Sequence, residues 1–220
     1  MKPTRRQMLT GMSALALVPA CKKRRSTHAD TGISNPEPAP ERDPEPEQLW
    51  VPSEPIDTEA FPSGVQVGDV GPDSALVSVW MSAETGQFML AKSTGEGWEI
   101  LPDSTPAIRD GVVAQVLIDG LEADAAYCVV AIADGARSTV SRFRTALGAD
   151  GFRQVTIGAT CCLRANHPWP SMSHVAGRRP DMFMLLGDTV YADHAETVEE
   201  YRTYWVEALT TAGLLDVSAA

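Results

Sequence analysis

Three side chains that could bind a metal stand in the last third of the sequence. Cys161 ends the stretch "FRQVTIGATC", and Asp188 follows "DMFMLLG", with Tyr191 three residues further on. A carboxylate can bridge two cations, while a thiolate and a phenolate are anionic ligands that suit a trivalent, Lewis-acidic iron. A metal held in this way could activate water. The alternative is that Cys161 is a core thiol and Asp188 a turn or helix-capping residue.

The elements around these residues alternate between strand and helix. We expect strands in 152–162 and 181–193, and helices at about 170–177 and in 195–215. This order predicts two parallel strands in a right-handed unit that is buried on both faces. Ligands gather at the carboxyl ends of parallel strands, which is where Cys161 and Asp188 fall.

The preceding segment, 61–147, has the pattern of an antiparallel β-sandwich. Short stretches such as "SALVSVWM" and "VVAQVLID" alternate at period two, and turn signals such as "GPDS" and "TGEG" separate them. Leu121, six residues before Tyr127, indicates a tyrosine corner, and the segment resembles a fibronectin type III-like domain. We expect Cys128, Trp80 and Trp98 in its core. The predicted fold class is therefore mixed, with an all-β sandwich followed by a βαβα piece of an α/β domain.

The N-terminal residues have the pattern of an export signal followed by a linker. In residues 1–25, Arg5 and Arg6 precede an apolar run of about a dozen residues, too short for a membrane helix of roughly 20. The pair resembles a twin-arginine export signal, with an ordinary secretory signal as the alternative. "LVPAC" resembles a lipobox that would lipidate Cys21, unless Cys21 belongs to a discarded peptide. Residues 26–60 are rich in proline and glutamate and predict a disordered linker.

Export by the twin-arginine machinery predicts a periplasmic or cell-surface protein, in contact with the membrane only through the lipid anchor. The net charge of −11 argues against a general nucleic-acid partner, because phosphates repel an acidic surface. The sequence has four cysteines but no CxxC pair, which argues against a zinc knuckle.

Four segments together resemble the alkaline phosphatase D (PhoD-like) family across about 61–205. These are "PSGVQVGDVGPDSALVSVW", "IGATCC", "RPDMFMLLGDTVYAD" and "ETVEEYRTYW". The resemblance implies a calcineurin-like metallophosphoesterase domain after the sandwich. It implies that Cys161 and Tyr191 bind iron(III) and that Asp188 bridges toward calcium. It also implies hydrolysis of phosphate mono- or diesters by metal-activated water.

The sequence departs from the family pattern at several positions. Leu185 and Leu186 replace its "HL", and Cys162 replaces a glutamine. A disulfide between the adjacent Cys161 and Cys162 would be strained, so we expect both to be free thiols. The family continues with "DDHE" and histidine ligands where these 220 residues end, so we expect an incomplete site that hydrolyses no ester alone. His194 lies near enough in sequence to approach the site. The alternative function is a non-enzymatic surface module that binds a partner through the sandwich.

Overall fold

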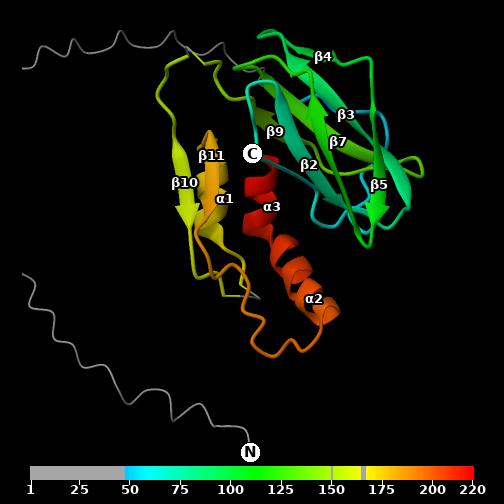
Figure 1. Ribbon diagram of the computed structural model, residues 1–220, viewed down its shortest axis with the longest axis vertical. Coiled ribbons are helices and arrows are strands. Elements are labelled where there is room, and N and C mark those ends of the chain that lie inside the picture. The colour runs from blue at the N-terminus through cyan, green and yellow to red at the C-terminus, as the bar shows by residue number, and fades with distance from the viewer. Residues whose placement is uncertain (1–47, 150, 165–166) are drawn as a thin grey trace, which may run out of the picture. The chain divides into compact units, whose positions relative to one another are not determined.

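The computed structural model describes residues 48–149, 151–164 and 167–220 (Figure 1). Arg5, Arg6, Cys21 and most of the predicted linker lie outside the described residues. The described residues belong to one compact unit. Within the described part of the chain, no helix has the length and apolar character needed to cross a membrane.

Nine strands form the sandwich, and all of their pairings are antiparallel. Strands β1, β2 and β6 make one sheet, and β3, β4, β7, β8 and β9 make the other. Strand β5 links the two sheets, because its first residues pair with β3 and its last residues pair with β6. Their bounds are β1 Val65–Gly68, β2 Ser74–Trp80, β3 Thr85–Ser93, β4 Trp98–Ile100, β5 Thr105–Asp110, β6 Val113–Asp119, β7 Ala126–Ala133, β8 Ala136–Arg137 and β9 Ser141–Arg144.

The period-two pattern in the sequence corresponds to real burial. Every second residue of β2 is buried, so Ala75, Val77 and Val79 enter the core between the sheets. By contrast, every residue of β7 is buried, including Cys128 as predicted. The prediction for Trp80 and Trp98 was wrong, because both rings are only half-buried, and the Trp98 Nε1–H donates to the Gln48 carbonyl at 2.8 Å.

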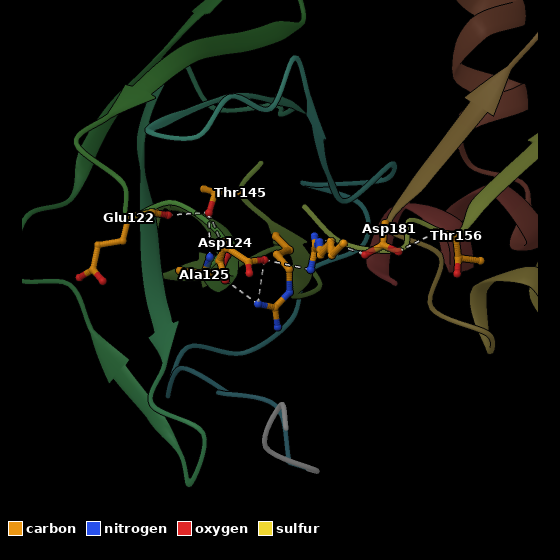
Figure 2. A network of polar contacts seen from close by, with 8 residues as sticks. Glu122, Asp124, Ala125, Thr145, Thr156 and Asp181 are labelled. Carbon is orange, nitrogen blue, oxygen red and sulfur yellow. Dashed lines mark hydrogen bonds and ion pairs between the residues drawn. The ribbon is translucent and has the colours of Figure 1, made fainter. Parts of the chain in front are cut away.

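The predicted tyrosine corner is present. The hydroxyl oxygen of Tyr127 accepts a hydrogen bond from the backbone N–H of Glu122 at 2.9 Å, and its ring stacks on Phe143 with 5.4 Å between centroids. Thr145 closes the same corner from the end of β9. Its side chain is fully buried, donates to the Glu122 carbonyl and accepts from the backbone N–H of Ala125 (Figure 2). The corner therefore ties the loop before β7 to the last strand of the sandwich.

Replacing Thr145 with valine is expected to lower the free energy of unfolding by about 1–3 kcal/mol. Valine has nearly the same shape, but the Ala125 N–H and the Glu122 carbonyl would both lose a buried partner. Urea denaturation followed by circular dichroism measures the change. The control is Thr58→Val, at an exposed position, which should stay within about 0.5 kcal/mol of the parent. Equal stability of Thr145→Val and the parent would contradict the role assigned to the hydroxyl.

The second part of the unit contains a small parallel sheet and three helices. Strands β10 (Ile157–Thr160) and β11 (Met182–Leu185) run parallel, with α1 (Pro170–Ala176) between them in sequence and α2 (Val198–Leu209) and α3 (Ala212–Ala219) after them. The predicted order of strand, helix, parallel strand and helix is confirmed. Both strands are shorter than the apolar stretches that predicted them.

The expectation of a sheet buried on both faces was wrong. A second core of Leu163, Met172, Ala208 and Leu214 lies among the helices and takes in Phe183 of β11. On the other side, Ile157 of β10 and Met182 of β11 are each more than half exposed. Helices cover only one face of this two-stranded sheet, so the apolar residues on the opposite face stay at the surface (Figure 1).

The predicted single helix over 195–215 is two helices. Thr197 begins α2 with a capping box, in which its side chain accepts from the N–H of Glu200 and the Glu200 carboxylate accepts from the N–H of Thr197. The chain leaves the helical path at Thr210 and Thr211, whose hydroxyls bond back to the Glu207 carbonyl, and α3 then starts. This break lets Leu214 of α3 enter the second core.

An arginine between β9 and β10 joins the sandwich to this second part. Arg153 Nη1 lies 2.9 Å from Asp124 Oδ1 in the tyrosine-corner loop, and Arg153 Nη2 lies 3.5 Å from Asp181 Oδ1 at the start of β11 (Figure 2). Asp181 also accepts from the N–H of Thr156, just before β10, at 2.8 Å. Side chains of Arg153 and Asp181 are 11% and 7% exposed, so this bridge is largely withdrawn from water.

Candidate metal centre

The loops that follow β10 and β11 are held side by side by their own backbones. Beyond the last strand residues, the N–H of Cys162 donates to the Gly187 carbonyl at 3.2 Å, and the N–H of Leu163 donates to the Asp188 carbonyl at 2.8 Å. Leu163 is buried in the second core, and Thr189 is also buried. These neighbours anchor both loops, so that Cys162 and Asp188 present their side chains at the carboxyl ends of the two strands.

Both of these residues have left-handed backbone conformations. The φ angle is +56° at Cys162 and +51° at Asp188. For residues other than glycine this region costs about 1–2 kcal/mol, although aspartate and asparagine tolerate it better than most. Gly187, with φ at +122°, precedes Asp188 and supplies a conformation that side chains rarely adopt. Of the six non-glycine residues with positive φ in the described chain, these two lie at adjacent strand ends.

Three side chains meet at this point. Asp188 Oδ2 lies 3.6 Å from the sulfur of Cys162 and 3.4 Å from the hydroxyl of Tyr191, which donates to it. The Tyr191 hydroxyl and the Cys162 thiol also interact, since each changes the pKa of the other. All three residues are exposed, so a small ion or a substrate from solvent could reach them. The structure thus brings together two of the three predicted ligands, Asp188 and Tyr191.

Cys161 is next to this cluster through its neighbour, and its thiol raises the pKa of the Cys162 thiol. Both are exposed free thiols, so the expectation that they do not form an adjacent disulfide agrees with the structure. Sequence reasoning placed Cys162 at the position of a family glutamine and gave it no role, yet its sulfur is the one in contact with Asp188. The adjacent pair "CC" was the only sequence signal that could have identified it. His194 is exposed in the loop after Tyr191.

The pKa values of Tyr191 and Cys162 are both raised by the groups around them. The hydrogen bond with Cys162, with smaller effects of burial and of the Asp188 carboxylate, raises the pKa of Tyr191 to about 12. For Cys162, the hydrogen bond with Tyr191 lowers the pKa, but the Cys161 thiol and the Asp188 charge outweigh it, and the net pKa is raised. The phenol is therefore protonated at neutral pH unless a cation binds there and displaces the proton.

The donor set is chemically suited to a metal. Among the described residues, no group of three or more His, Cys, Asp and Glu side chains has the arrangement of a metal site. The cluster includes a phenol, however, and with it offers sulfur, carboxylate and phenol donors in mutual contact. Thiolate and phenolate suit iron, and a carboxylate suits calcium or a bridging role. These donor types suit the metals that the family resemblance implies, but the described residues bring too few of them together to complete a metal site.

The fold of the chain is similar to that of known proteins. No family model and no curated protein matches the chain. The chain is similar to a structure described as "Structure of PhoD", with a TM-score of 0.64 and 20% identity, over 79% of this chain and 38% of that one. This likeness shows the fold alone, and the chain spans 38% of the length of that protein.

Two fibronectin type III domains are similar to the sandwich at lower scores. The FN5 domain of Drosophila Lar is 22% identical over 44% of this chain and 100% of its own, with a TM-score of 0.32. The fn3 domain of the human collagen alpha-1(XX) chain is 17% identical over 48% of this chain and 96% of its own, with a TM-score of 0.33.

Proposed function

We propose that the chain contributes the first part of a metal-dependent phosphoesterase of the alkaline phosphatase D type, acting on phosphate mono- or diesters. The observation that carries the proposal is the contact of Asp188 with Tyr191 and a cysteine thiol at the carboxyl ends of two parallel strands. The likeness of the fold to PhoD supports it. Because the chain spans 38% of that protein's length, the activity belongs to a site that the described residues supply only in part.

In this proposal Cys161 and Tyr191 would hold iron(III), and Asp188 would serve both the iron and calcium. The metals supply Lewis acidity, which lowers the pKa of water and offsets the charge of a phosphate ester. The side chains of the chain itself supply the anionic charge that attracts the cations and fix their position. Asp188 and Cys162, on backbones held by the opposite loop, keep the donors in register. Their exposure leaves the site open to an ester from solvent.

The proposal is tested by the colour of the iron-loaded chain. Because the pKa of Tyr191 is about 12, phenolate forms at neutral pH only on binding a cation, and iron(III) phenolates absorb visible light. Titration of the 220-residue chain with iron(III) should produce a visible band. Tyr191→Phe should weaken this band and change its wavelength, since only the absorption of the Cys161 thiolate would remain, and inorganic phosphate should shift the band of the parent. The control Tyr204→Phe, in α2, should keep the band. A colourless parent, or a band that Tyr191→Phe leaves unchanged, would refute this ligand set.

Export by the twin-arginine route is a further part of the proposal and rests on "TRRQML" in the sequence. Replacing both Arg5 and Arg6 with lysine is expected to leave the precursor in the cytoplasm, because that route requires the paired arginines while an ordinary secretory signal accepts any basic start. Cell fractionation with antibody detection measures the distribution. The control Lys22→Arg with Lys23→Arg keeps the charge and should export normally. Normal export of the Arg5, Arg6 variant would exclude the route.

A further inference from the structure

Two exposed thiols stand next to each other just after β10. Cys161 and Cys162 are both free and both exposed, and the N–H of Cys162 is held by the Gly187 carbonyl at 3.2 Å. The remaining cysteine of the described chain, Cys128, is buried in the sandwich. Among the described residues, each thiol of the pair therefore has only its neighbour as a thiol partner at the surface.

The backbone at this pair departs from strand geometry. In an extended strand successive side chains point to opposite faces, which would keep two adjacent thiols apart. β10 ends at Thr160, and Cys162 has φ at +56°, so this alternation does not extend over the pair. The Cα atoms of adjacent residues lie about 3.8 Å apart across a trans peptide, which is closer than in most disulfides. A bond between these two sulfurs would therefore be strained, and strained, exposed disulfides are the readily reduced ones.

We propose that Cys161 and Cys162 form a redox modification site, which a small disulfide such as oxidised glutathione converts reversibly into a disulfide between the two neighbours. One cysteine thiolate attacks a sulfur of the oxidant and releases the first glutathione. The neighbouring thiolate then attacks the cysteine sulfur of the mixed disulfide and releases the second. The pair loses two protons and two electrons, and the oxidant becomes two glutathione thiols. The inference goes beyond the proposed function, because it needs no metal.

The test incubates the full 220-residue chain, carrying Cys21→Ser, with oxidised glutathione. Free thiols are then blocked with N-ethylmaleimide, and the tryptic peptides are measured by mass spectrometry. Both cysteines fall in the peptide "QVTIGATCCLR", which should be unblocked and lighter by two hydrogens. Cys161→Ser and Cys162→Ser, made in the same chain, are the matched variants, and each should keep glutathione on its remaining cysteine. The chain with both cysteines should carry at least about tenfold less of this adduct, because the neighbouring thiol attacks within the same molecule.

Cys128 reports whether the reaction takes place in the folded chain, because its side chain is fully buried and should escape N-ethylmaleimide until the sandwich unfolds. Reduced glutathione in excess should restore both thiols, as expected of a strained bond. The inference would be overturned by no reaction at all, by equal adduct in the chain with both cysteines and the single variants, by a disulfide between two chains, or by a bond that forms only after unfolding in urea. The iron(III) titration of the reduced chain tests the proposed function separately.

Discussion

Replacing Asp188 with asparagine is expected to weaken metal binding by at least about 100-fold. Loss of an outer-shell partner alone costs 10- to 100-fold, and Asp188 is the residue that contacts both Cys162 and Tyr191. Asparagine has the same shape and tolerates the left-handed backbone at φ +51°, so the chain should remain folded. The change therefore removes the charge and leaves the loop in place.

Calorimetric titration with Co²⁺ or iron(III) measures this loss. The control Asp103→Asn removes the same charge from an exposed turn of the sandwich, so it accounts for any effect of net charge at a distance. Its affinity should match that of the parent. If Asp188→Asn binds as tightly as the parent, Asp188 is only a turn residue, and the alternative considered from the sequence holds.

Replacing Arg153 with methionine is expected to lower the free energy of unfolding of the second part by about 2–3 kcal/mol. Removing one partner of a buried ion pair costs about 3–5 kcal/mol, because the other charge is left buried. We expect a smaller loss of stability than this for two reasons. The side chain of Asp124 is 43% exposed, so water screens its charge. The contact of Arg153 Nη1 with Asp124 is an ion pair without the alignment of a hydrogen bond. Methionine keeps much of the apolar stem and its packing.

The helical signal in circular dichroism reports this effect, because the three helices of the described chain all follow Arg153 in sequence. The loss of helix should come at lower urea than in the parent. Arg202→Met is the matched control, since Arg202 is exposed and pairs with Glu199 on the surface of α2, where such a pair contributes little. An identical transition in the Arg153 variant would show that Arg153 does not hold the two parts together.

Much of the sandwich could be predicted from its longer strands. Strands β2, β3 and β6 follow from the alternation of apolar and polar residues, and β7 follows from the apolar stretch around Cys128, which is buried at every position. The spacing of Leu121 and Tyr127 predicted the corner. Strands β4 and β5 were missed, since three residues of β4 contain too little alternation to detect and β5 divides its pairing between β3 and β6.

The candidate site could be predicted in its location but not in its contacts. The order of elements placed Cys161 and Asp188 at the carboxyl ends of two parallel strands, and in the structure they follow β10 and β11. The contact of Asp188 with Cys162 rather than Cys161 depends on the left-handed backbone at Cys162, which side-chain patterns do not predict. Val198 and Tyr201 have the spacing of an apolar helix face, but in the structure both side chains are exposed to solvent.

The contrast between β7 and β10 has a consequence for the exchange of backbone amide hydrogens with deuterium. β7 is buried along its whole length and paired on both sides, so its amides exchange only when the sandwich unfolds. β10 pairs with β11 alone and exposes every second residue, so its amides exchange through brief local openings. The amides of Cys162 and Leu163 close that edge by bonding to the opposite loop. Their deuterium uptake would therefore slow when a cation binds beside them, so the exchange of these two amides would report whether the metal site is occupied.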